Sequence, residues 1–158
     1  MKRRNMLAAA AAGLALAALS GAAAAQPTMK SVAGTYSAVT VRAFGDKPHG
    51  QMILTPGGRY NIIVRRAQLA PVTSGVRNKA TDAENKLLVD GSISHFGKYT
   101  IDDGGKSITF HVEQSSFPNW DGKPQKRALK VSGDTLTYTV GTPSDGGKPS
   151  DVVWKRVK

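Results

Sequence analysis

A histidine and a glutamate lie two positions apart in a segment that alternates like a β-strand. Residues 107–114, SITFHVEQ, carry His111 and Glu113 on one face, and the other face is apolar. Because side chains alternate along a strand, the two point the same way and lie about 7 Å apart. Such a pair can perform general acid–base chemistry on a bound substrate. His111 and Glu113 are therefore the candidate catalytic residues, and they are candidate ligand contacts as well.

A cationic side chain follows on the next predicted strand. Arg127 lies within residues 125–133. If its face and that of His111 both look into a barrel, Arg127 can pair with Glu113, because a buried carboxylate without a partner has a raised pKa. Three interpretations stay open. The group can be an internal network that fixes strand register, a polar anchor for the carboxylate or hydroxyl of a ligand, or an acid–base site.

An aromatic corner separates these two strands. Phe117 and Trp120 flank Pro118, which has no N–H donor and ends the strand. Each aromatic side chain can bury about 150–250 Å². They either plug one mouth of a barrel or line the entrance to a cavity. Tyr60, on the inward face of another predicted strand, is a further candidate ligand contact.

Other site chemistries find little support. The chain has no cysteine, which excludes disulfides, thiolate metal sites and cysteine nucleophiles. No Gly-x-Ser-x-Gly motif of a serine hydrolase occurs. The three histidines, His49, His95 and His111, are isolated and lack the spacing of metal ligands. We expect neither a metal nor a cofactor, and we expect His95 to order the end of a short helix.

The elements that position these residues are short strands separated by turn sequences. Proline and glycine turns such as Pro56-Gly57-Gly58 join β-rich runs into hairpins. Eight strands are predicted, at residues 34–44, 50–55, 59–67, 97–102, 106–114, 125–133, 135–140 and 151–157. One short helix is predicted within 81–96, capped by Thr81 or Asp82 and limited by Gly91. The sequence thus predicts an all-β fold, an eight-stranded antiparallel barrel whose interior suits side chains or one small ligand.

The first 25 residues are typical of a signal peptide. Basic residues precede an apolar, alanine-rich run that ends in Ala23-Ala24-Ala25, and we expect cleavage before Gln26. Export by the general or the twin-arginine route then leaves one domain, residues 26–158, in the periplasm or outside the cell. The run is too short and too rich in alanine for a membrane span.

The formal charge of +11 does not by itself indicate a partner. The basic residues are scattered, without a dense run or a basic helix, so we expect a solvated cationic surface and no specific nucleic-acid binding.

Several segments resemble the lipocalin-like domain family of bacterial and fungal proteins, which are small calycin-type barrels. They are Gly34-Thr35-Tyr36, LTPGGRY (54–60), HFGKYTID (95–102), HVEQSSFPNW (111–120) and QKR (125–127). The resemblance covers residues 31–157 and implies a barrel with a small central cavity. It also implies a structural base made by Gly34, Tyr36 and Arg156, in which the guanidinium stacks on the aromatic ring; tyrosine replaces the usual tryptophan.

Three functions follow from these patterns. The first is an exported protein that binds a small hydrophobic molecule in its cavity, with residues 68–80 as the lid. The second is a cofactor-free isomerase or cyclase that uses His111 and Glu113. The third is a filled barrel whose outer surface binds a partner. The sequence favours the first; it does not identify the ligand or the oligomeric state.

Overall fold

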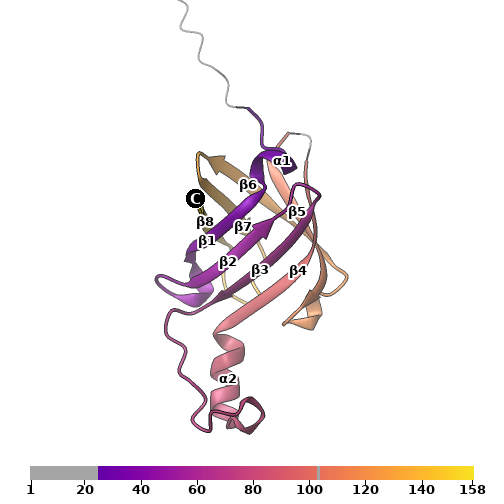
Figure 1. Cartoon of the computed structure of the whole chain (residues 1–158). Coiled ribbons are helices and arrows are strands. Elements are labelled where there is room, and N and C mark those ends of the chain that lie inside the picture. Colours follow the sequence, from indigo (N-terminus) through magenta and orange to yellow (C-terminus); the bar gives the residue numbers. More distant parts are fainter. Residues whose placement is uncertain (1–24, 103) are drawn as a thin grey trace, which may run out of the picture.

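The strands close into a single antiparallel barrel in the computed structural model, which describes residues 25–102 and 104–158 (Figure 1). Each strand pairs with the next, and the last pairs with the first. The strands are β1 (Gly34–Val41), β2 (His49–Leu54), β3 (Arg59–Arg65), β4 (Ser92–Ile101), β5 (Ser107–Ser115), β6 (Pro124–Ser132), β7 (Thr135–Val140) and β8 (Ser150–Arg156). The predicted all-β, eight-stranded barrel is therefore confirmed. The predicted signal peptide lies, except for its last residue, outside the described residues.

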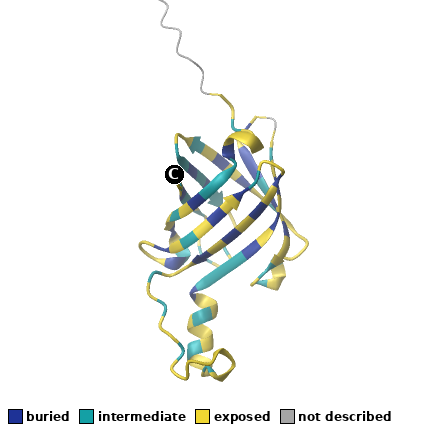
Figure 2. Ribbon diagram, in the orientation of Figure 1, coloured by how far each residue is buried: buried dark blue, intermediate teal, exposed yellow. Residues whose placement is uncertain are grey.

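Alternating side chains place the core inside the barrel. On β3, Tyr60, Ile62 and Val64 are buried while the residues between them are exposed (Figure 2). This period of two follows from the pleat of a strand, which sends successive side chains to opposite faces. The hairpin between β2 and β3 turns at Gly58, whose φ of 81° suits a residue without a Cβ.

One end of the barrel is closed by a four-residue helix, α1 (Met29–Val32), which the sequence did not predict. Val32 is fully buried, and its carbonyl accepts a hydrogen bond of 2.7 Å from the Tyr36 hydroxyl. Tyr99 donates its hydroxyl to the carbonyls of Met29 and Thr55, at 3.1 and 2.7 Å. Tyrosines from the barrel wall thus hold α1 over this end, which we call the base.

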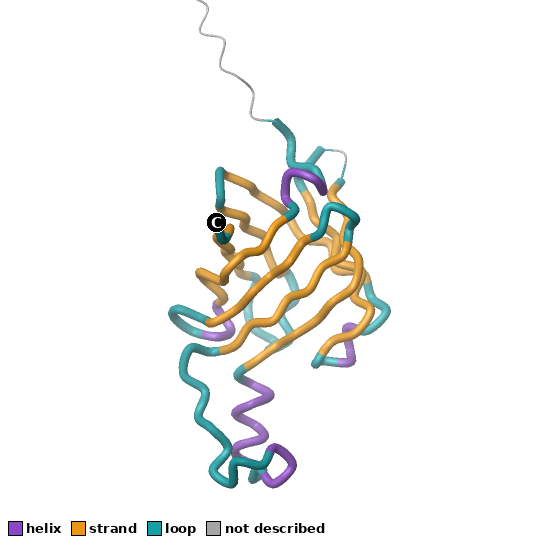
Figure 3. The backbone as a smooth tube through the Cα atoms, viewed as in Figure 1, coloured by secondary structure: helices purple, strands orange, loops and turns teal. Residues whose placement is uncertain are grey.

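The connection from β3 to β4 extends beyond the opposite end of the barrel as an arm (Figures 1 and 3). It contains the 3₁₀ turn η2 (Arg77–Lys79) and the helix α2 (Asp82–Asp90). Thr81 and Glu84 form a reciprocal capping box at the start of α2, as the sequence predicts for Thr81. Residues 92–96, predicted as part of the helical segment, instead begin β4. None of the described helices has the length and apolar character needed to cross a membrane.

Candidate functional site

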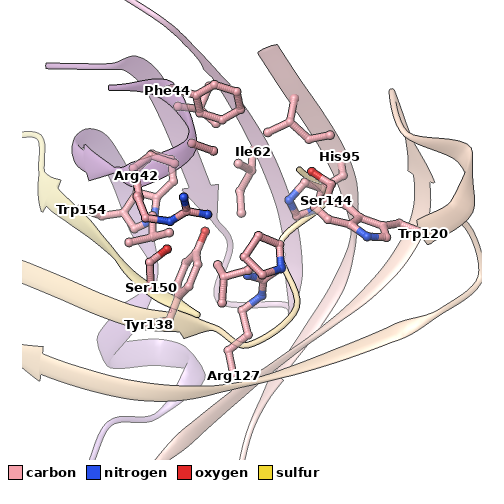
Figure 4. Close-up of a pocket in the computed structure, with 17 residues that line it drawn as sticks. Arg42, Phe44, Ile62, His95, Trp120, Arg127, Tyr138, Ser144, Ser150 and Trp154 are labelled. Carbon is pink, nitrogen blue, oxygen red and sulfur yellow. The ribbon is translucent and has the colours of Figure 1, made fainter. Parts of the chain in front are cut away.

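A small cavity lies inside the barrel at the end that faces the arm (Figure 4). It measures about 70 Å³, and its walls are mostly apolar. The 3₁₀ turn η1 (Arg42–Phe44) and the segment 143–144 cover it, and Arg42 forms an ion pair of 3.3 Å with Asp145 across this cover. Residues 68–80 contribute no side chain to the lining, so the prediction that they form the lid is wrong.

Arg127 enters this cavity from β6 (Figure 4). Its guanidinium lies 5.1 Å from the ring centre of Tyr138 and 5.8 Å from that of Phe110. It donates a hydrogen bond to the side chain of Gln125, but its Nε has no protein partner. The residue is only 7% exposed, and burial lowers its pKa. None of the described lining residues is an Asp or a Glu, so this buried cation has no carboxylate beside it.

A second hydrogen-bond donor without a partner lines the same cavity. The indole N–H of fully buried Trp154 approaches the Tyr138 hydroxyl without reaching hydrogen-bond geometry. Burial raises the pKa of Tyr138, and the nearby Arg127 guanidinium opposes that rise. Two buried donors around one cavity are therefore free to bond an acceptor that enters it, either water or a ligand.

A tyrosine–histidine pair lies at another part of the cavity wall, where His95 lines the cavity and Tyr60 lies behind it. The Tyr60 hydroxyl and His95 Nδ1 share a hydrogen bond of 2.8 Å, and burial raises the pKa of the tyrosine. Burial and the positive charge of Arg127 lower the pKa of His95 to about 3, so its ring is neutral at neutral pH. A neutral imidazole beside a fixed cation adds no second charge to the cavity.

His95 is a site residue that the sequence reasoning missed. It was expected to order the end of the helix, but it lies inside the barrel on β4, opposite Ile62 of β3. Counting back in twos from buried Tyr99 reaches Gly97 and then His95. This alternation was the signal in the sequence that placed His95 inside the barrel. It was missed because residue 95 had been assigned to the helical segment.

The two aromatic rings of the Phe117–Trp120 corner line two different spaces. Trp120 ends the 3₁₀ turn η3 (Pro118–Trp120) and lines the cavity, with its ring 5.4 Å from that of His95. Phe117 packs against Trp120 at 5.7 Å but lines an outer hollow near α2 instead. Both rings are partly buried, so the corner forms part of the wall and rim of the cavity.

His111 and Glu113 lie on the outer surface of β5, and the expectation that their face looks inward is wrong. Glu113 pairs with exposed Arg59, with Nη2 and Oε2 3.0 Å apart, and this hydrogen bonding lowers the pKa of the glutamate. His111 lies 3.4 Å from the Thr100 hydroxyl. His111 and Glu113 point outward because the opposite face of β5, which carries Phe110 and its apolar neighbours, is buried. Only one face of a strand can enter the barrel, and removing the apolar face from water is favourable.

The predicted pairing of Arg127 with Glu113 therefore does not occur. In the ladder between β5 and β6, Arg127 lies opposite Ile108 and points inward, whereas Glu113 points outward. His111 and Glu113 contribute nothing to the cavity. Trp120 and Arg127 line it, and Tyr60 is linked to it only through its hydrogen bond to His95.

Gly34, Tyr36 and Arg156 meet at the base of the barrel, away from the cavity. The Arg156 guanidinium lies 4.8 Å from the ring centre of Tyr36 and donates hydrogen bonds to the carbonyls of Ala33 and Ser31. A Cβ at Gly34 would collide with this guanidinium. No three His, Asp or Glu side chains within residues 25–102 and 104–158 are arranged to hold a metal ion.

Comparison with known proteins agrees with this architecture. A family model described as the lipocalin-like domain matches residues 26–157, and the chain belongs to that family. The chain is 29% identical over 69 residues to the 4'-hydroxy-3'-methoxypropiophenone carrier protein ppsC of Aspergillus oryzae. This match covers 40% of the chain and 62% of the length of that relative.

Proposed function

We propose that this lipocalin-like protein binds a small organic molecule in the barrel cavity and carries it. The observation that supports this most is the buried, unpaired Arg127, which lines an otherwise largely apolar space. A buried guanidinium without a carboxylate opposes folding, because it loses its hydration without gaining a counter-charge. Its position is explained if a ligand supplies the missing acceptor. Few polar groups in an apolar pocket are the usual design of a ligand site.

The shape of the barrel interior also favours binding over a purely structural role. Large side chains fill the base, where Tyr36 and Tyr99 are almost completely buried. The opposite end keeps the cavity, so the barrel is only partly filled. The isomerase or cyclase alternative loses its candidate residues, because His111 and Glu113 lie outside the barrel.

The relative suggests the size and chemistry of the ligand. Its name specifies an aromatic ketone with a phenolic hydroxyl and a methoxy group. Here, the aromatic side chains of Tyr138 and Trp120 line the cavity and could flank such a ring, while Arg127 and Trp154 could donate to its oxygens. We extend the proposal to export through residues 1–25 into the periplasm or the medium, which a processed chain beginning at Gln26 would support.

Native mass spectrometry of the purified protein tests the binding proposal. The protein would be examined alone and with 4'-hydroxy-3'-methoxypropiophenone, for the wild type, for Arg127→Met and for Lys130→Met. Lys130 lies on the same strand but is exposed, which makes it a matched control. We expect a one-to-one complex, weakened by Arg127→Met alone. If neither this compound nor any co-purified small molecule binds, the carrier proposal fails.

A further inference from the structure

The barrel wall opens between β6 and β7 at the level of Arg127. The ladder between these strands pairs Leu129 with Tyr138 and ends there. Two more residues in the same register would place Arg127 opposite Val140, but no such pair forms. The first half of β6 therefore has a partner strand only on its β5 side, and a window is left in the wall. Arg127 lies in this window.

At the window, the cavity lies next to a hollow on the outside of the barrel. Trp120, Arg127 and Val140 line both spaces, so these three side chains form the boundary between them. The outer hollow measures about 340 Å³ and has Lys123 and Lys126 on its lining. Neither space has an Asp or a Glu among its described lining residues. The charged side chains that line the two spaces are thus all cationic.

The Arg127 guanidinium lies at the boundary between the cavity and the outer hollow. It is 7% exposed, it lies beside two aromatic rings that contact each other, and its Nε has no protein partner. Arginine has donors only, so the missing partner must be an acceptor. A neutral acceptor would satisfy the N–H but would leave the buried charge uncompensated. An anionic oxygen would do both, and a charge-assisted hydrogen bond is about twice as strong as a neutral one.

The size of the cavity explains why the ligand would reach the window. One water occupies about 10–15 Å³ of such space, so 70 Å³ holds only a few waters. A ligand with about a dozen non-hydrogen atoms must extend beyond it. The cover at the barrel end is held by the ion pair between Arg42 and Asp145, whereas the window contains an unpaired cation.

We propose that the carried ligand is an organic anion with an apolar body inside the barrel and a carboxylate or phenolate oxygen at the window, paired with Arg127. Lys123 and Lys126 at the outer rim attract the anion towards this entrance. The inference rests on the proposed carrier function and specifies its ligand class. It also assigns the window, rather than the end near the arm, as the place where the charged group of the ligand lies.

Isothermal titration calorimetry with trans-cinnamate and its neutral isostere cinnamamide tests the charge preference. The two differ only at the acidic group, which is ionised in cinnamate at pH 7.4. The wild-type protein should bind cinnamate about tenfold more tightly or better, because only the anion compensates the buried charge of Arg127. Arg127→Met should abolish this preference, whereas Lys130→Met should keep it. The double variant Lys123→Met, Lys126→Met should slow cinnamate association in stopped-flow experiments and reduce its dependence on salt.

The outcomes separate this inference from the carrier function. Equal binding of cinnamate and cinnamamide by the wild type would leave a carrier of neutral molecules and would overturn the anion proposal. A charge preference that survives Arg127→Met would place the anion elsewhere and would overturn the assignment of the window. Association rates unchanged by the double lysine variant would overturn entry past the rim. Binding of neither compound, together with a negative result for the propiophenone, would refute both proposals.

Discussion

Replacing Arg127 by methionine is expected to stabilise the ligand-free protein while it destroys the binding site. The guanidinium is almost fully buried and has no carboxylate partner. Methionine keeps an unbranched side chain of similar reach, but it needs no hydration. A residue that lowers stability and yet is required for binding has the signature of a functional group, since function and stability often conflict at sites.

The magnitude follows from the contacts of the guanidinium. Desolvation of one charged group opposes folding by several kcal/mol. The two aromatic contacts return about 1 kcal/mol each. The hydrogen bond to Gln125 returns about 2 kcal/mol. The balance is unfavourable to arginine by about 1 kcal/mol or slightly more, so Arg127→Met should raise the melting temperature by about 3–4 °C.

A second arginine that stacks on an aromatic ring, Arg156, provides the control. Arg156 also lies over a tyrosine ring, but it donates to two backbone carbonyls and remains partly exposed. Arg156→Met leaves those carbonyls without their donor and removes the stacking on Tyr36. We expect a loss of about 2 kcal/mol. Two arginines with similar aromatic contacts should therefore respond to the same substitution with opposite signs.

Urea denaturation followed by tryptophan fluorescence measures both changes. An unchanged slope with a shifted midpoint would show that stability itself changed. A drop in midpoint for Arg127→Met comparable with that for Arg156→Met would refute the reasoning. It would mean that the contacts of Arg127 outweigh its desolvation and that the residue is a structural element of the wall.

Three further predictions concern the base, the arm and the cavity. Gly34→Ala should destabilise the protein by about 2 kcal/mol in the same denaturation assay, because its Cβ would collide with Arg156 and its φ is 154°; an unchanged midpoint would mean that the base adjusts freely. Hydrogen bonds from two threonines lower the pKa of Glu84 to about 2, so its contribution to the arm is complete above about pH 4.3 and is lost as the pH falls through 2. Amide chemical shifts in the arm should titrate near pH 2 in the wild type and not in Glu84→Gln, and a midpoint near pH 4 would contradict the capping geometry. The pKa of His95 is lowered to about 3, so the unfolded chain takes up a proton below about pH 6.5 that the folded chain does not, and stability should fall from pH 6.5 towards pH 3. The histidine contribution to the slope approaches about 1.4 kcal/mol per pH unit and should disappear in His95→Gln, which can still hydrogen-bond Tyr60; an unchanged slope would show that His95 is accessible to protons.

The architecture could be predicted because its signals are local. Alternation of apolar and polar residues, together with Gly and Pro turns, located all eight strands. The bounds agree to within about three residues except for β4, which begins at Ser92 rather than at residue 97. The capping pattern at Thr81 and the break at Gly91 defined α2. Residues 42–44, predicted as strand, instead form η1, and residues 92–96, predicted as helix, begin β4 after the single turn residue Gly91.

The candidate site could be predicted only in part. Arg127 was identified because an arginine alternates with apolar residues on β6, and the strand period alone carries it inside. On β5 the same period places His111 and Glu113 outside if Phe110 is inside. The expectation that His111 and Glu113 look inward was therefore an error in the choice of face. The register between β5 and β6, which sets Arg127 opposite Ile108, depends on how the whole barrel closes.

Local sequence patterns specified the strands and the barrel they close, because the side-chain period of a strand is set by its own backbone. They left open which face of β5 enters the barrel. Only the tertiary structure decided that a cavity remains, that η1 and the segment 143–144 cover it, and that β6 and β7 part beside Arg127. A cavity is the difference between the volume that eight strands enclose and the volume that their side chains fill. That difference depends on residues far apart in the chain, such as Phe44, His95 and Trp154, whose packing no local pattern specifies.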